Sequence, residues 1–451
     1  METRIKNINT CVTCDDGDRV LRGVDLRIAD GLIAEMGPGL AMRGDAEWID
    51  GSRLWVYPGL INTHHHLYQY FTRNLPAVRN MALFDWLKTL YPVWARLDAD
   101  SVYYSTLLGG AELLLHGCTT LLDHHYVFPQ GAGDLMEAQF AAAAALGLRF
   151  CACRGSMDLS EKDGGLPPDS VVQSIDEILA DTARVAARFH NPAPHSMRRV
   201  LAAPCSPFSV SAALLREAAA QARSLGLRLH THLAETADEE AYALAKFGLR
   251  PLAYMESVDF IGSDVFYAHG IHFNDAEIAR LAETGTGIAH CPSSNMKLHS
   301  GALRMAALQR AGVPLGLAVD GSASNDGSNL LAEIRAAYLL HRHTQGEAAP
   351  DGYDLLKLAT RGGAALLGRP ELGQLAVGHA ADLFAIRCDA PCLIGAQGDP
   401  AAVFGTVGWN GPAELVMVGG RVLVRGGELA APILDDTTLN RARLAQARVG
   451  F

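Results

Sequence analysis

The chain has 451 residues, which is the length of about three average domains or of one α/β barrel of about 250 residues with additions. Hydrophobic residues make up 49% of the chain and charged residues 19%, which supports a large buried core and excludes a mainly disordered protein. The 38 basic and 49 acidic side chains give a net charge of −11, which argues against a nucleic-acid partner because such proteins concentrate positive charge.

The two ends of the chain have the sequence pattern of short β-strands separated by turns. Near the C-terminus, Gly419-Gly420 separates two short apolar runs, which is a signal for a two-residue hairpin. We therefore predict one small β-sandwich domain built from residues 1–56 and 371–451. Its candidate strands are Val20–Ile28, Leu32–Met36, Ala381–Arg387, Leu415–Val418 and Arg421–Val424.

The middle of the chain, residues 57–370, alternates short apolar runs with helical segments rich in alanine. Eight strands alternating with helices over about 300 residues is typical of a (β/α)8 barrel, and a doubly wound parallel sheet is the alternative. The candidate strands are Gly59–His64, Thr119–Asp123, Leu148–Cys153, Val200–Pro204, Leu227–His232, Val265–His269, Thr286–His290 and Leu315–Asp320.

Four of these strands end in polar side chains that can bind a metal ion. His64 and His66 are two residues apart and therefore share one face of the first strand. His232, His269 and Asp320 end the fifth, sixth and eighth strands. The C-terminal ends of barrel strands carry the active site, and imidazoles with one carboxylate suit Zn²⁺ or Fe²⁺.

Most other histidines receive no role, because a single histidine at a strand end is usually structural. We interpret His230 as packing inside the barrel, one position below His232 on the same face. We also interpret five further histidines as structural, namely His116, His195, His299, His341 and His343.

The sequence resembles the amidohydrolase superfamily, and within it the mononuclear branch of aminohydrolases and triazine hydrolases. The segments that carry the resemblance are PGLINTHHH, LHTHLAET, YAHG, GLAVDGSASND and GHAADLFAIR. The resemblance implies that His64, His66, His232 and Asp320 are the metal ligands. Binuclear members bridge two ions with a lysine on the fourth strand, which here reads VLAAPCS. We therefore expect one divalent ion per subunit, zinc in the first place and iron as the alternative.

The resemblance also implies a mechanism in which the cation lowers the pKa of a water molecule from ~15.7 to about 7. Asp320 takes a proton from this water, Glu235 protonates a ring nitrogen of the substrate, and His269 orients the nucleophile. Attack on the amino-bearing ring carbon then expels ammonia. The alternative for Glu235 is an ordinary glutamate in the first turn of a helix, where the helix dipole favours a negative charge.

The substrate pocket is expected in the aromatic loop after the first strand. Gln69 is a candidate for reading a carbonyl and ring N–H pair, Trp86 either walls the ring or packs the loop, and Cys205 with Ser206 lines the floor. Arg73 is expected to be solvated.

The segments NTHHHLYQ and WLKTLYPVWARL resemble the 8-oxoguanine deaminase group, which implies conversion of 8-oxoguanine to urate and ammonia. The alternative substrates for a deaminase reaction of this protein are guanine, isocytosine and cytosine. A triazine chlorohydrolase, and a scaffold that has lost its metal, are the alternatives from other classes. Glu235 and His269 favour loss of an amine, because amine leaving groups need a proton and chloride does not.

The remaining expectations concern the surroundings of the protein. No apolar run approaches the ~20 residues that span a bilayer, and the first residues lack the apolar core of a signal peptide. Nine cysteines are too sparse for a disulfide scaffold, and the single CxxC, Cys11 to Cys14, is expected to be structural. We expect a cytoplasmic homo-oligomer that binds a small heterocyclic base and contacts neither nucleic acid nor membrane.

Overall fold

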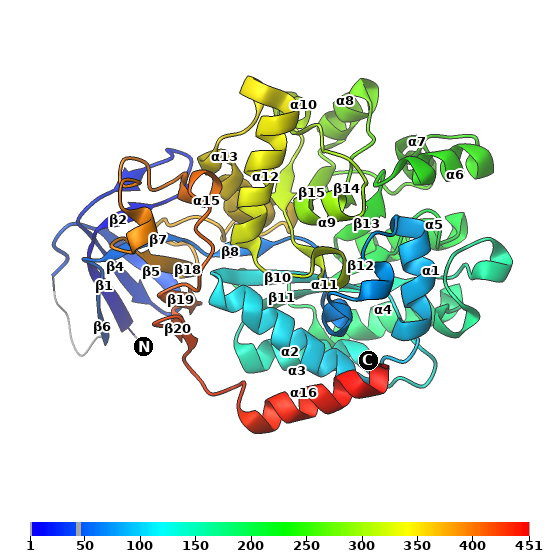
Figure 1. The fold of residues 1–451 in the computed structure, drawn as a ribbon, viewed down its shortest axis with the longest axis horizontal. Helices are drawn as coiled ribbons and strands as arrows, with labels where there is room; N and C mark the ends of the chain where they lie inside the picture. The colour runs from blue at the N-terminus through cyan, green and yellow to red at the C-terminus, as the bar shows by residue number, and fades with distance from the viewer. Residues whose placement is uncertain (1, 42–46, 451) are drawn as a thin grey trace.

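The computed structural model of the protein describes residues 2–41 and 47–450. Residues 1, 42–46 and 451, which belong to the predicted terminal domain, lie outside the described residues. Figure 1 shows two regions, a group of terminal sheets on the left and a larger body of alternating strands and helices on the right. The limits given above for the two domains stay predictions.

The larger body is built on eight parallel strands, and the prediction of a (β/α)8 barrel is confirmed. The strands are buried on both sides; every residue of β10, for example, is buried, which is why the runs are continuously apolar. The strands pair in chain order, and His65–His66 after the first strand pairs with Asp320–Gly321 after the last, so the sheet closes on itself and the alternative of a doubly wound sheet is wrong. In the order in which they pair, the strands are β8 (Leu60–Asn62), β10 (Cys118–His125), β11 (Arg149–Ser156), β12 (Arg198–Pro204), β13 (Leu229–Leu233), β14 (Val265–His269), β15 (Gly287–His290) and β16 (Leu315–Leu317).

The barrel closes where its first and last strands meet, and both strands are interrupted there. The first strand continues after a gap as β9 (His65–His66), and the last continues as β17 (Asp320–Gly321). These two short pieces pair with each other in parallel. Thr63 N and Oγ1 both donate to the carbonyl of Leu317, at 3.4 and 3.0 Å. The predicted strand Gly59–His64 ends inside the first gap, and Leu315–Asp320 runs through the second, because the local apolar pattern does not reveal the breaks.

Helices connect the strands and cover the outside of the barrel (Figure 1), as crossovers between parallel strands must. Many begin at a residue that caps the free N–H groups; Ser174 and Glu177, for example, form a capping box at the start of α4. The helices around the barrel are α1 (Leu83–Trp94), α2 (Ala99–Leu115), α3 (Leu135–Leu146), α4 (Ile175–Phe189), α5 (Ala212–Ser224), α6 (Ala237–Phe247), α7 (Pro251–Ser257), α8 (Asp275–Thr284), α9 (Pro292–Lys297), α10 (Met305–Ala311), α11 (Ser322–Asn325), α12 (Leu330–Gln345), α13 (Gly352–Lys357) and α14 (Gly363–Leu366).

The two ends of the chain share a seven-stranded sheet. Strand β18 pairs antiparallel with β7, and the predicted hairpin is β19 and β20, joined by Gly419 and Gly420 at φ of 53° and 75°. In order, the sheet contains β21 (Glu428–Leu429), β20 (Arg421–Arg425), β19 (Leu415–Val418), β18 (Leu383–Arg387), β7 (Leu54–Pro58), β2 (Thr10–Val12) and β3 (Val20–Leu21).

A four-stranded sheet from the N-terminal part packs against the seven-stranded sheet. Residues of both sheets form an apolar core that is separate from the main core of the protein. Two helices follow the barrel segment, and α16 lies along α2 on the outside of the barrel. The strands of this sheet, in order, are β5 (Leu32–Gly37), β4 (Val24–Ala29), β1 (Glu2–Ile8) and β6 (Glu47–Asp50), and the two helices are α15 (Val403–Thr406) and α16 (Asp436–Val449).

A buried ion pair joins the seven-stranded sheet to the bottom of the barrel. Asp382, just before β18, accepts hydrogen bonds from Arg149 at the start of β11, at 2.5 and 3.0 Å, and neither residue is more than 4% exposed. Asp382 also accepts from Gly419 N in the hairpin turn. Since β11 begins at this end, the terminal sheets contact the barrel away from the C-terminal ends of its strands, and the mouth stays free.

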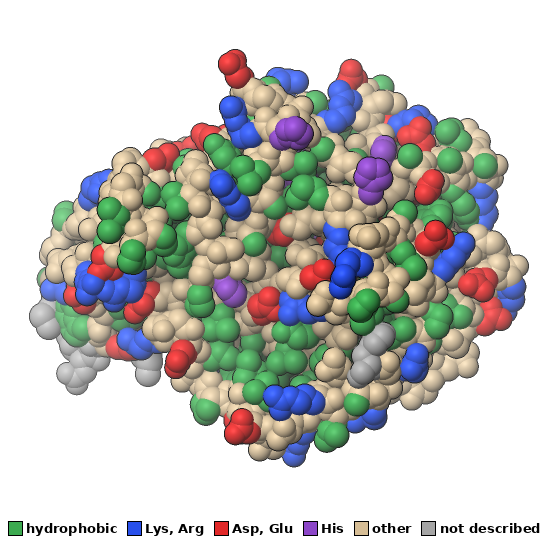
Figure 2. All heavy atoms as spheres, in the orientation of Figure 1, with side chains coloured by type: hydrophobic (Ala, Val, Ile, Leu, Met, Phe, Trp, Pro, Cys, Tyr) green, Lys and Arg blue, Asp and Glu red, His purple; other side chains and the backbone are tan. Residues whose placement is uncertain are grey.

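The surface offers few features beyond this. On the face drawn in Figure 2, acidic and basic side chains are interspersed, so the described residues of this face form no broad basic patch of the kind nucleic acids contact. Within the described ranges, no helix is both long and apolar enough to cross a bilayer. All nine cysteines are free thiols, and Cys11 and Cys14 are buried.

Candidate metal centre and active site

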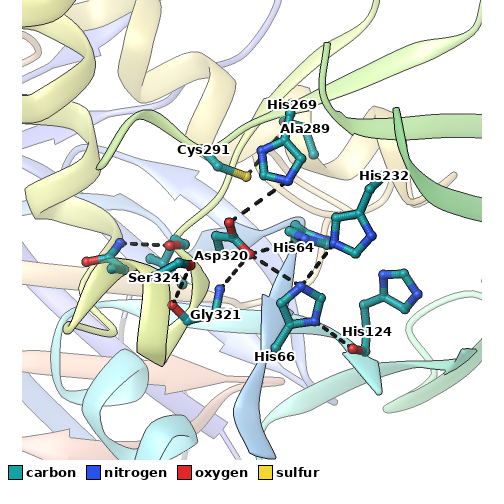
Figure 3. Close-up of polar contacts among 12 residues, drawn as sticks. His64, His66, His124, His232, His269, Ala289, Cys291, Asp320, Gly321 and Ser324 are labelled. Atoms are coloured by element: carbon teal, nitrogen blue, oxygen red, sulfur yellow. Dashed lines mark hydrogen bonds and ion pairs between the residues drawn. The ribbon is translucent and has the colours of Figure 1, made fainter. Parts of the chain in front are cut away.

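The four predicted ligands lie together at the mouth of the barrel. His64 Nε2 is 3.3 Å and His66 Nε2 is 3.4 Å from Asp320 Oδ1, and the Nε2 atoms of His66 and His232 are 3.1 Å apart. None of the four side chains is more than 8% exposed. Figure 3 shows them pointing toward one another.

The breaks in the first and last strands place these side chains. His64 lies in the gap between β8 and β9, and its carbonyl accepts a hydrogen bond from Asp320 N at 3.1 Å. His66 faces the cluster, whereas His65 points away and contacts Ser328 Oγ at 3.1 Å. Asp320 has a φ of +64°, a strained conformation for a residue other than glycine and one typical of functional sites.

The hydrogen bonds of the second ring nitrogens determine the tautomers of His66 and His232. His66 Nδ1 donates to the carbonyl of His124 at 2.7 Å, and His232 Nδ1 donates to the carbonyl of Cys205 at 2.6 Å. A carbonyl only accepts, so both Nδ1 atoms carry the proton and both Nε2 atoms present a lone pair to the cluster. Burial lowers the pKa of both imidazoles, so the rings are neutral.

His64 has a different partner, which is another histidine. Its Nδ1 lies 2.8 Å from Nε2 of His230, and His230 Nδ1 donates to the carbonyl of Phe266 at 2.9 Å. His230 thus contacts a predicted ligand, and its ring also stacks on that of Phe266 inside the barrel. The Nε2 atom of His64 is buried and has no hydrogen-bond partner among the described residues.

These observations fit a site for a divalent cation. An orphaned imidazole nitrogen, two more imidazole lone pairs and a carboxylate converge, and the pKa of His64 is lowered by burial, so its ring is neutral as well. Burial raises the pKa of Asp320, but contact with His64 and the charges around it outweigh this, so the net pKa is well below the ordinary value. Asp320 is thus a carboxylate.

Glu235 and His269 lie beside this cluster. His269 Nε2 is 3.4 Å from Glu235 Oε2 and 3.9 Å from Asp320 Oδ2. On its other side, the amide of Asn295 donates to His269 Nδ1 at 3.0 Å. With Nδ1 as the acceptor, the proton of a neutral His269 is on Nε2, facing the two carboxyl groups.

A turn before α6 holds Glu235 in place. The carboxylate of Glu239 accepts hydrogen bonds from Ala234 N and Glu235 N, both at 2.8 Å, and Ala234 has a φ of +53°. Helix α6 begins only at Ala237, so the alternative of a first-turn helix glutamate at position 235 is wrong. Burial first, and then the charges of Asp320 and Glu239, raise the pKa of Glu235 well above its usual range, which favours the protonated form of this carboxyl group.

Sequence reasoning missed three residues of this site, namely His124, Glu239 and Asn295. His124 belongs to the histidine cluster: its ring stacks on His232, and its Nε2 donates to the carbonyl of Ala203 at 2.9 Å. It stands in the pair His124-His125 at the end of β10, one residue beyond the predicted strand, and that position was the available signal. Glu239 and Asn295 gave none, because helices and loops contain many such residues.

A cavity opens beside the cluster. Gln69, Trp86 and Cys205 all line it; Gln69 Oε1 accepts from Ala323 N at 3.3 Å, and Trp86 Nε1 is buried without a hydrogen-bond partner among the described residues. Arg73 instead pairs with Glu112 at 2.7 Å, so the expectation that it is solvated is wrong. The lining residues are His66, Gln69, Leu83, Trp86, Leu87, Tyr91, Tyr126, Cys205, Ser206, Phe208, His232, Glu235, His269, Leu298, Asp320 and Ser324.

Comparison with known proteins agrees with this architecture. Residues 55–423 match the Amidohydrolase family, and the chain belongs to that family. It is 47% identical to the 8-oxoguanine deaminase of Pseudomonas aeruginosa, a match covering 93% of this chain and 96% of that protein. It is 44% identical to the hydroxydechloroatrazine ethylaminohydrolase of Pseudomonas sp. strain ADP, covering 96% and 92%. The structure of atrazine chlorohydrolase TrzN from Arthrobacter aurescens TC1, complexed with zinc, superposes with a TM-score of 0.94 at 31% identity, covering 99% of this chain and 100% of that one.

Proposed function

We propose that the protein is a metal-dependent aminohydrolase that converts 8-oxoguanine to urate and ammonia. The observation that carries the proposal is the buried Glu235, 3.4 Å from His269 and next to a cluster of three imidazoles and one carboxylate, at the wall of the cavity. The relative that shares 47% of its residues with this chain supports the choice of substrate.

The proposed ligands of the cation are His64, His66, His232 and Asp320. We propose one divalent ion, zinc first and iron as the alternative, since β12 ends at Pro204 without a lysine that could bridge a second ion. The structural relative complexed with zinc supports this choice. A cation bound by these residues would lower the pKa of a water molecule and supply the nucleophile at neutral pH.

The protein side chains move the protons. Asp320 accepts a proton from the attacking water, while Glu235 donates its own proton to the ring nitrogen next to the carbon under attack. The Nε2–H of His269 donates a hydrogen bond that holds the nucleophile in line. The proton taken by Asp320 then passes to the exocyclic amine, which leaves as ammonia. The remaining O–H proton of the adduct returns to Glu235, so the ring carbon keeps the oxygen as a carbonyl and the acid is restored.

The cavity suits a flat, uncharged heterocycle. Leu83, Leu87 and Phe208 give it apolar walls, and none of the residues that line it is lysine or arginine, so a phosphorylated nucleotide would enter without a counter-charge. Trp86 Nε1 offers an unused donor, which we assign to a carbonyl oxygen of the substrate. Gln69 and Cys205 complete the proposed contacts.

Ammonia release from a panel of heterocycles tests the assignment. The panel contains 8-oxoguanine, guanine, isocytosine, cytosine, adenine and an aminotriazine, with chloride release followed for a chlorotriazine. We expect 8-oxoguanine to have the highest kcat/KM, with isocytosine as a slower substrate because it presents the same amino, imine and carbonyl edge. If guanine or a triazine is faster by an order of magnitude, the substrate assignment is wrong while the aminohydrolase assignment stands.

Triazine hydrolysis is the second candidate. It is favoured by the relative that acts, by name, on hydroxydechloroatrazine and by the fold of the atrazine chlorohydrolase. The raised pKa of Glu235 favours departure of an amine, because an amine needs a proton to leave and chloride does not. Between triazine reactions, we therefore favour loss of an amine.

The donor of Trp86 gives a testable contribution to substrate binding. Trp86→Phe keeps an aromatic wall but removes the N–H, so a substrate carbonyl loses its partner in a buried pocket. We expect kcat/KM for 8-oxoguanine to fall about tenfold, which corresponds to about 1.4 kcal/mol, mostly through KM.

Trp94→Phe is the matched control for this variant. Trp94 packs against Trp86, but its Nε1 donates to Thr72 Oγ1 inside the protein and it does not line the cavity. We expect this variant to lower the melting temperature without changing KM. An unchanged KM in Trp86→Phe would remove the indole N–H from substrate recognition.

A cytoplasmic location and a homo-oligomeric state are also proposals. The free thiols of all nine cysteines support a reducing compartment. Light scattering of the purified protein measures the oligomeric state directly.

A further inference from the structure

The ligand His64 differs from the other two histidine ligands in what holds its second nitrogen. His66 and His232 donate to backbone carbonyls, which always accept. His64 Nδ1 instead meets Nε2 of His230, an atom that donates or accepts depending on its own tautomer. The tautomer of His64 therefore depends on the tautomer of His230.

The hydrogen bond to Phe266 determines the tautomer of His230. His230 Nδ1 lies 2.9 Å from the carbonyl of Phe266, which only accepts, so Nδ1 carries the proton. In this tautomer, with the proton on Nδ1, the Nε2 atom of His230 offers a lone pair. Nε2 then accepts the Nδ1 proton of His64, and the lone pair of His64 is left on the buried Nε2 atom that faces Asp320.

We propose that His230 is a positioning residue for the metal ion, which fixes the tautomer and the ring orientation of His64. The chain of contacts crosses from the first barrel strand to β13 and ends on β14. The contact with His230 holds the ring of His64 at a position outside the regular strand, since His64 lies in the gap between β8 and β9. The inference rests on the proposed function, since it assumes that His64 binds the cation.

A histidine is a suitable choice for this position. A carboxylate at the same place would accept the same proton but would add a second buried negative charge below the cluster, next to Asp320. A neutral imidazole accepts the hydrogen bond without that charge, and its flat ring stacks on Phe266, with ring centroids 4.2 Å apart. His230 thereby satisfies the packing of the barrel and the tautomer of the ligand at once.

The test measures zinc affinity, which does not depend on turnover. His230→Phe keeps a flat ring against Phe266 but removes the acceptor for His64. We expect the dissociation constant of Zn²⁺, from competition with a chromophoric chelator, to rise about 10- to 100-fold, as is typical when the partner of a ligand histidine is lost. His230→Gln, whose amide oxygen is again an acceptor, is expected to restore most of the affinity.

His341→Phe is the matched control. His341 Nε2 lies 3.0 Å from His290 Nε2, so this variant also breaks a buried contact between two histidines, but outside the cluster. We expect it to lower the melting temperature and leave the zinc affinity unchanged. If His230→Phe does not fold, His230→Asn replaces it, because its shorter side chain does not reach His64.

The possible results separate the inference from the proposed function. If His230→Phe folds and binds Zn²⁺ as tightly as the parent protein, the positioning role is wrong and His230 only packs. An equal loss in the phenylalanine and glutamine variants would also overturn it, because the acceptor would then be irrelevant. If the parent protein binds no Zn²⁺, the proposed function fails, and this inference fails with it.

Discussion

Replacing Glu235 with glutamine is expected to reduce kcat for 8-oxoguanine by about 10²- to 10⁴-fold, the usual contribution of a positioned acid. Glutamine has nearly the same shape but no proton to give to the ring nitrogen, so negative charge builds up on the ring as the nucleophile adds. Because Glu235 is not among the proposed ligands, zinc content should stay at one ion per subunit. Steady-state kinetics and elemental analysis of the same sample measure both quantities.

Glu283→Gln is the control for this substitution. It makes the same chemical change on α8, at a side chain that is 70% exposed, and we expect kcat and metal content to be unchanged. Full activity in Glu235→Gln would remove this residue from the mechanism. Loss of the metal together with activity would show instead that Glu235 supports the site and would leave its role as an acid without support.

Removal of the cation is expected to abolish activity and to destabilise the fold. A chelator should reduce turnover to below about one hundredth, because none of the remaining side chains ionises water at neutral pH. Three buried neutral imidazoles and Asp320 would then face one another without a charge to balance the carboxylate. A ligand present at about 1,000 times its dissociation constant stabilises the native state by about 4 kcal/mol, so the melting temperature should fall by several degrees.

Reconstitution provides the control for the stripped protein. Zn²⁺ should restore both turnover and melting temperature at one equivalent per subunit, whereas Mg²⁺ should restore neither, because it prefers oxygen ligands over imidazoles. A stripped sample that keeps full turnover would contradict the proposed mechanism. Recovery only above one equivalent would contradict the single-ion site.

The positions of the site residues along the strands could be predicted, but most of their partners could not. The period of two places His64 and His66 on one face, and apolar runs that end in His232, His269 and Asp320 indicate the strand ends. The partners of these residues lie on other elements. Neither the local pattern around His230 nor that around Asn295 indicates that these side chains reach His64 and His269.

By itself the sequence determined the eight-stranded barrel, the terminal hairpin at Gly419-Gly420 and the set of polar residues at the strand ends, because these depend on patterns within a few neighbouring residues. The tertiary structure alone decided the breaks in the first and last strands, the relay from His64 through His230, and the raised pKa of Glu235. The reason is that barrel closure sets which side chains meet across the interior. The pKa of a side chain such as Glu235 depends on its burial and on charges that are close in space, whatever their separation along the chain.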